Sequence, residues 1–261
     1  MRPTPLLFIA IALLSLTGCA QQTAIANHDS AALVQAIRAA NQTPGKDVIR
    51  LAHRGLYVIG GPAEPGLLLP AIRGELQIIG DGAEIRGYTG DKLALLQIDK
   101  GSTLALDNLS LAEGSEGAVR NFGALRMTAV RIIDSTGSRS SAIVLNHGDI
   151  DAVDSEIAYN TLAGAHRDAG TVLNFGRIVL DRTTIHDNRA IGGSPNLAVA
   201  GGVLNYGSLR VDGLVMQDND AEQGAAALQA DGILNLGNGE VEGATARGAI
   251  RNGGGLAILN P

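Results

Sequence analysis

The chain has 261 residues and a formal charge of −6; 45% of its residues are apolar and only 3% are aromatic. This length and apolar content are enough to bury a core, and the acidic balance without basic clusters argues against nucleic acid as a partner. Thirty-five glycines, no tryptophan and a single cysteine argue against a core built on aromatic rings, exclude an internal disulfide and favour a solenoid.

The first predicted element is a signal peptide over residues 1–18, in which one arginine precedes an apolar run from Leu6 to Leu16. The run ends in Leu16-Thr17-Gly18-Cys19, which resembles the lipobox of bacterial lipoproteins. The resemblance implies cleavage before Cys19 and acylation of its thiol. Because Ala20 follows rather than aspartate, it also implies transfer to the outer membrane, facing either the periplasm or the exterior. We expect residues 19–28 to form a short lipidated tether.

A helix is predicted next, because Leu33, Ala36 and Ile37 follow helical spacing behind Asp29 or Ser30 as the N-cap. This amphipathic helix is expected to cap the first coil of the solenoid, whose open edge would otherwise pair with another chain. Alternating apolar residues then predict strands over residues 47–51, 56–59, 76–87 and 104–111. The last of these is offset from Gly101 by one extra residue relative to the later coils.

The strongest internal signal is a five-residue frame, Val or Ile, any residue, Asn, any residue, Gly, which occurs six times. The spacings between its asparagines are 25, 28, 31, 30 and 17 residues, and the first four suit one coil of a β-helix each. A stacked asparagine can donate to the carbonyl of its counterpart about 4.8 Å away, which satisfies a side chain that would be costly to bury alone. The predicted structural ladder consists of Asn121, Asn146, Asn174, Asn205, Asn235 and Asn252, with a second ladder of Asn160, Asn188 and Asn219.

The segment from Ser30 to Ile49 and the coil Gly201-Gly202-Val203-Leu204-Asn205-Tyr206-Gly207 resemble bacterial surface β-helix proteins. These are the polymorphic-outer-membrane-protein-like, pectin-lyase-like repeat proteins. The resemblance covers roughly residues 29–260 and implies an all-β fold, a right-handed parallel β-helix over residues 29–261. It implies no particular activity, since fold alone does not carry function.

Polysaccharide lyases and hydrolases share this fold, and they need an acid and a base, or two or three carboxylates, in one groove. Candidate neighbours of this kind are His147-Gly148-Asp149 and His186-Asp187, but adjacent residues on a strand point to opposite faces. The sequence contains no nucleophile elbow, phosphate loop or metal-ligand spacing, so no catalytic residue, metal or cofactor is predicted. The acidic candidates occupy expected outward positions and comprise Asp149, Asp151, Asp154, Asp181 and Asp212.

Two outward columns flank the predicted asparagine ladder and form a candidate binding stripe. The column after each asparagine contains Phe122, His147, Phe175 and Tyr206, and the column before each is mostly leucine. Loops over residues 189–200 and 220–231 could fold back and cover both columns. The sequence therefore favours a non-catalytic, lipid-anchored protein of the cell envelope that binds a glycan or a protein partner, or serves as a scaffold. A polysaccharide lyase, hydrolase or epimerase is the alternative.

Overall fold

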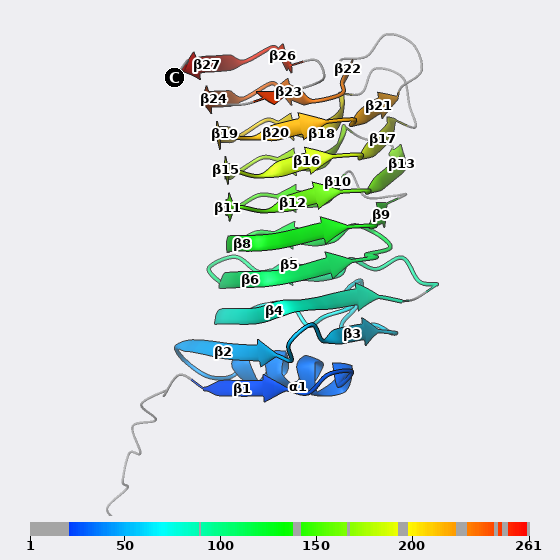
Figure 1. Ribbon diagram of the computed structural model, residues 1–261, viewed down its shortest axis with the longest axis vertical. Helices are drawn as coiled ribbons and strands as arrows, with labels where there is room; N and C mark the ends of the chain where they lie inside the picture. Colours follow the sequence, from blue (N-terminus) through cyan, green and yellow to red (C-terminus); the bar gives the residue numbers. More distant parts are fainter. Residues whose placement is uncertain are drawn as a thin grey trace, which may run out of the picture.

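The computed structural model is a parallel β-helix whose coils stack along one axis (Figure 1). The structure describes residues 21–88, 90–137, 142–165, 168–192, 198–222, 229–242, 245–246 and 250–259. Each coil adds parallel strands to the sheets of the previous coil, so the all-β solenoid predicted from the repeat is confirmed. The expected signal peptide and Cys19 lie outside the described residues.

The largest sheet runs the whole height of the solenoid and contains one strand from every coil. Its strands in spatial order are β1 (Gln22–Ile25), β2 (Lys46–Leu51), β4 (Glu75–Gly87), β6 (Thr103–Ala112), β8 (Ala124–Ile133), β11 (Asp149–Val153), β15 (Arg177–Asp181), β19 (Ser208–Asp212), β24 (Asn238–Glu242) and β27 (Gly255–Leu259). A second arm of the same sheet adds β3 (Leu56–Ile59), β12 (Glu156–Ala158), β16 (Thr184–His186), β20 (Val215–Gln217) and β25 (Thr245–Ala246).

Two further sheets close the coils. The second sheet contains β5 (Leu96–Ile98), β7 (Val119–Asn121), β10 (Ala142–Asn146), β14 (Ala169–Asn174), β18 (Val199–Asn205), β23 (Ile233–Asn235) and β26 (Ile250–Asn252), and β22 (Gln229–Ala230) pairs with β18. The third contains β9 (Thr136–Gly137), β13 (Thr161–Ala165), β17 (Arg189–Gly192) and β21 (Asp220–Glu222). The asparagine of the repeated frame is the last residue of β7, β10, β14, β18, β23 and β26, and the glycine of the frame follows in the turn.

The coils turn at two recurring corners where non-glycine residues adopt the left-handed conformation, with φ between 44° and 59°. The corner between the two arms of the first sheet is made by Asn108, Ala129, Asp154 and Arg182. The corner before the third sheet is made by Glu113, Asp134, Tyr159, Asp187 and Asp218. Aspartate and asparagine recur at these corners because their short polar side chains tolerate this conformation best among residues with a Cβ.

The core is a narrow aliphatic column inside the coils. Alternation along β11 buries Ile150 and Ala152 and leaves Asp149 exposed, and the equivalent positions of β8 and β15 follow the same pattern. Parallel register places Ile150 beside Leu125 and Ile178, so each apolar residue packs on its counterparts above and below. Burial of such side chains stabilises the fold by roughly 1.5–3 kcal/mol each relative to full exposure.

Helix α1 (Ser30–Ala40) closes the N-terminal end of this core, as predicted. The Asp29 side chain accepts a hydrogen bond from Ala32 N at 2.9 Å and begins the helix as its N-cap. Leu33 and Ile37 are fully buried in the core, and α1 lies beside β1 and β3 at the lower end of the molecule (Figure 1). Among the described helices, none is long and apolar enough to cross a membrane.

Part of the segment predicted to form a tether belongs to the solenoid. Residues 22–25, which were placed within the tether, form strand β1 and pair in parallel with Val48–Leu51 of β2. Ile25 is buried and joins the core, because the alternation of β1 continues the apolar column past the helix. The solenoid therefore begins at Gln22 rather than at residue 29.

Candidate binding surface

The asparagine ladder predicted from the repeat is confirmed. Each Nδ2 donates to the Oδ1 of the next ladder asparagine, at 2.6–2.8 Å, from Asn121 through to Asn252. Each also donates to backbone carbonyls at the turn, as Asn174 does to Gly176 O and Ser208 O. The second ladder is present as well, since Asn160 donates to Asn188 and Asn188 to Asn219, both at 2.9 Å. Apart from Asn252 at the exposed end, these side chains are buried and satisfy one another, which is a structural role.

The leucine column beside the ladder is buried over three coils, so this half of the candidate stripe is not exposed there. Leu173, Leu204 and Leu234 are at most 2% exposed. They pack with Ala198, Ala200 and Ala230 in a separate apolar cluster outside the main core. These leucines are therefore buried, but residues 193–197 and 223–228 of the two loops that could cover the columns lie outside the described residues. Leu145 and Arg120, nearer the N-terminal end, are half-buried.

The aromatic column remains open over three coils. Phe122 and Phe175 are 38% and 44% exposed, and His147 between them is also exposed. The rings stack in parallel, with centroids 5.4 Å apart for Phe122–His147 and 4.8 Å for His147–Phe175, and interplanar angles of 7° and 10°. Because the rings cover one another's faces, the inner rings present mainly their edges to solvent.

Tyr206 continues the stack but lies at the edge of the covered region. Its ring lies 5.3 Å from Phe175, while its hydroxyl donates a hydrogen bond to Asp168 Oδ2. The other oxygen of Asp168 accepts from Ala198 N at 2.8 Å, which links the ring to the residue just before β18. Burial, together with the Asp168 carboxylate, raises the pKa of Tyr206 far above its ordinary value. Of the four predicted contact residues, Tyr206 is thus half-buried and the other three are open.

Most of the acidic candidates take part in ion pairs between neighbouring coils. Asp151 pairs with Arg177 at 2.8 Å, and Arg182 bridges Asp154 at 2.8 Å and Asp181 at 2.7 Å. The hydrogen bond from Arg182 holds the pKa of Asp154 below its ordinary value. Asp149 and Asp212 are exposed, and Asp149 lies next to the aromatic column. The five carboxylates are therefore spread over the surface and do not converge in one groove.

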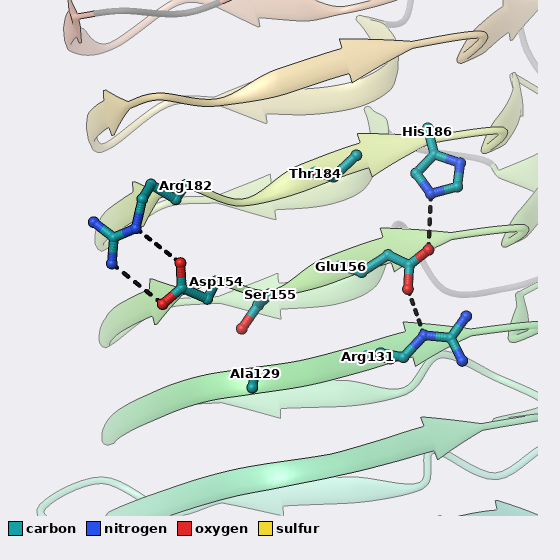
Figure 2. Close-up of a pocket in the computed structure, with 8 residues that line it drawn as sticks. All are labelled: Ala129, Arg131, Asp154, Ser155, Glu156, Arg182, Thr184 and His186. Carbon is teal, nitrogen blue, oxygen red and sulfur yellow. Dashed lines mark hydrogen bonds and ion pairs between the residues drawn. The ribbon is translucent and has the colours of Figure 1, made fainter. Parts of the chain in front are cut away.

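One pocket brings charged residues together on the other side of the molecule, at the bend of the first sheet (Figure 2). It has a volume of about 460 Å³, and its wall carries Asp154, Glu156 and His186. Glu156 accepts hydrogen bonds from Arg131 Nε and, at 2.9 Å, from His186 Nε2, while His186 Nδ1 lies 2.7 Å from Asp187 (Figure 2 shows the first two).

Sequence reasoning did not single out Glu156 or Arg131. The signal that could have identified them is register, since Arg131, Glu156 and Thr184 occupy one column in successive coils.

The electrostatics of this pocket favour ion pairing over acid catalysis. Burial would raise the pKa of Glu156, but hydrogen bonds from Arg131 and His186 outweigh it and lower the pKa. Asp154 is held ionised by Arg182. A glycoside hydrolase needs one carboxyl group that stays protonated, and neither of these two meets that need. Within the described ranges, no cluster of three His, Cys, Asp or Glu side chains could hold a metal ion.

Comparison with known proteins gives no match: no family model, no curated protein and no solved structure matches this chain. The function is therefore argued from the geometry of the two surfaces described above.

Proposed function

We propose that this protein is a lipid-anchored module of the bacterial cell envelope that binds or scaffolds a partner through the ring edges of Phe122, His147 and Phe175. The observation that carries the proposal is the contrast between two parallel columns. The leucines are buried, while the rings next to them stay exposed. Aligned apolar groups that a protein leaves uncovered usually mark a contact surface.

The proposed anchor lies close to the rigid body. Cys19 precedes the first residue of β1, Gln22, by three positions, a span of about 10 Å at full extension. An acyl group on Cys19 would hold the α1 end of the solenoid at the membrane surface, with the aromatic column above it. The lipobox-like segment and the resemblance to bacterial surface β-helix proteins support an outer-membrane location for this arrangement.

A polysaccharide-active enzyme is the second candidate. The observation in its favour is the hydrogen-bonded pair of Glu156 and His186 in a groove that also contains Asp154. The lowered pKa of both carboxyl groups counts against a hydrolase, because such an enzyme must protonate its leaving group. We therefore rank binding above catalysis.

Affinity electrophoresis tests the proposal with soluble residues 20–261 run through gels that contain acidic or neutral envelope polysaccharides. We expect at least one polysaccharide to retard the protein and Phe175→Ala to remove most of this retardation. Tyr88→Ala is the matched control, since Tyr88 is 73% exposed and lies outside the column. The length of each polysaccharide is compared before and after incubation. Shortened chains would overturn the proposal in favour of the enzyme, and retardation that Phe175→Ala leaves intact would place binding elsewhere.

A further inference from the structure

One edge of strand β3 joins β4, and the other edge faces helix α1. Glu84 N donates to Gly55 O at 2.8 Å and Tyr88 N donates to Ile59 O at 2.9 Å, so these odd-numbered residues direct their C=O groups toward β4. Backbone groups alternate in direction along a strand, so the even-numbered residues between them direct theirs to the opposite edge. In Figure 1, α1 lies on that side of β3.

This second edge is paired at its first residue and open at the next position. Leu56 N donates to Asn27 Oδ1 at 2.8 Å, and Leu56 O accepts from His28 N at 3.2 Å. Val58, two residues further along, presents the same pair of groups, and within the described ranges neither of them has a partner in the chain on this side. The pairing stops short of Val58 because the chain turns into α1 at Asp29.

A groove separates this open position from the helix. It has a volume of about 260 Å³ and no charged residue in its lining, which includes Ala31, Val34 and Gln35 of α1 and Val58, Gly60 and Gly61 on the other side. Val58 is 38% exposed, and a Cβ on Gly61 would meet no heavy atom within 4 Å, so the groove is accessible. Pockets for small molecules usually measure roughly 300–1,000 Å³, so this smaller groove suits a short length of extended chain.

We propose that this groove binds an extended, uncharged peptide segment of a partner protein, which adds to β3 as one further strand. The N–H and C=O of Val58 supply main-chain hydrogen bonds to the peptide, the usual source of affinity when a peptide adds to a sheet edge. The peptide continues the pairing that Asn27 and His28 begin with Leu56. Charged side chains and proline are the usual protection of a strand edge, and the segment from Val58 to Gly61 contains neither.

The walls of the groove determine the composition of the peptide. Ala31 and Val34 give the helix wall small apolar side chains, and Val58 adds another from the strand. A charged peptide side chain would lose hydration here without a counter-ion among the lining residues. Valine and threonine fit best, because they are small and favour strands. The groove lies at the α1 end of the solenoid, away from the aromatic column, so the proposal goes beyond the function proposed above.

An array of heptapeptides built from valine, threonine, alanine, serine and glycine tests the proposal with soluble residues 20–261. We expect some members to bind, and their counterparts with glutamate or lysine in place of valine to bind about tenfold more weakly or less. The strongest member is then titrated by fluorescence polarisation. N-methylation of every second backbone nitrogen should weaken binding about tenfold in one of the two possible phases and little in the other, because only alternate N–H groups face β3. Equal weakening in both phases would overturn the addition of a strand.

Two substitutions on α1 locate the site. Ala31→Arg places a long side chain in the groove and should weaken peptide binding about tenfold or more. Ala39→Arg is the matched control, since Ala39 is exposed on the same helix, about two turns further along and outside the groove. It should bind the peptide like the parent protein. Equal weakening by both variants would overturn the proposal.

The Val58 backbone is tested in two ways. Val58→Pro removes the N–H that faces the groove and leaves the bonds to β4 in place, so it should weaken binding about tenfold. Hydrogen exchange of the parent protein decides the matter if this variant does not fold. The peptide should slow exchange of the Val58 amide about tenfold and change the Leu56 amide little, since Asn27 already holds it. Unchanged exchange at Val58, or an array without a bound peptide, would overturn the proposal. Self-association that Ala31→Arg abolishes, without peptide binding, would make a second copy of the chain the occupant.

Discussion

Asn146 Nδ2 donates a hydrogen bond of 2.7 Å to the Oδ1 of Asn174, a residue 28 positions further along the chain and one coil higher. The same relationship links Asn174 to Asn205 at 2.6 Å, so each amide is both donor and acceptor in a buried row. The row runs along the axis of the solenoid, whereas the backbone strands run across it. It therefore links coils whose intervening segments differ in length.

Replacing a central member of this row is expected to be costly. Asn174→Ala removes the acceptor of Asn146 and the donor of Asn205, and it leaves buried polar groups without partners. We expect the free energy of unfolding to fall by about 2–3 kcal/mol. Asn252→Ala is the matched control at the exposed end of the row, where water can replace the lost bond, and about 1 kcal/mol or less is expected. Urea unfolding followed by circular dichroism measures both, and equal losses would contradict a buried ladder.

The glycine two positions after each ladder asparagine permits close stacking of the turns. A Cβ on Gly176 would lie 2.0 Å from Gly148 O, a distance at which the backbone of the lower coil must move. We expect Gly176→Ala to lower the free energy of unfolding by about 3 kcal/mol through overpacking. Gly61→Ala, where a Cβ meets nothing within 4 Å, should change it by about 0.5 kcal/mol or less. Chemical denaturation compares the two, and a stable Gly176→Ala protein would show that the coils are looser than described.

Stability should depend on pH through His186. Burial would lower the pKa of His186, but hydrogen bonds to Asp187 and Glu156 outweigh it and raise the pKa above 6.5. Because the pKa is raised in the folded state, the protonated His186 side chain stabilises the fold. This contribution to the free energy of unfolding is fully present below pH 6.5 and is lost as pH rises through the folded pKa. The wild type should therefore lose more stability than His186→Gln between about pH 6 and about pH 9. Thermal melts across this range test the difference, and parallel curves would contradict it.

Glu156 makes the stability of the fold depend on pH in the opposite direction, at acidic pH. Its pKa in the folded state lies below 4.5. The ionised side chain therefore adds to the free energy of unfolding above pH 4.5, and this contribution is lost as pH falls through the folded pKa. Glu156→Gln should flatten the acid side of the stability curve, and it should also reduce the loss on the alkaline side, because Glu156 is one of the two groups that raise the pKa of His186. The groups that face His186 from the packed strands are Glu156 and Asp187, with the Tyr159 ring at its edge and Arg131 on the far side of Glu156.

Membrane attachment is expected to depend on Cys19. In a bacterial host that processes lipoproteins, the full chain should incorporate labelled palmitate and sediment with membranes, because more than one acyl chain gives stable anchoring. Cys19→Ser should abolish incorporation and release the protein into the soluble fraction. The fold of residues 21–259 should be unaffected, which circular dichroism of the released protein checks. Palmitate on the Cys19→Ser protein would show that the anchor lies elsewhere.

The sequence by itself determined the coil and its repeat. Alternation with period two assigns each residue to the inside or the outside of a strand, and the recurring asparagine and glycine define the turn, so both ladders could be predicted. The cap of helix α1 at Asp29 was equally local, since an N-cap needs only a side chain and the first turn of backbone. These features depend on neighbouring residues or on positions that repeat, and both are visible in one amino-acid sequence.

Only the tertiary structure decided which outward residues are accessible and which meet. Periodicity places Leu204 and Phe175 alike on the outer side of the chain, but it does not say that Leu204 is fully buried in a cluster with Ala198 while Phe175 stays exposed. The alignment of Arg131 with Glu156 was available from spacing, since each lies eight residues after a glycine of the repeated frame, but the wide turn over residues 99–102 beneath Phe122 was not, because the segment before it lacks the frame. The physical reason is that covering and alignment are contacts between distant segments, and their free energy is settled by the packing of the whole solenoid.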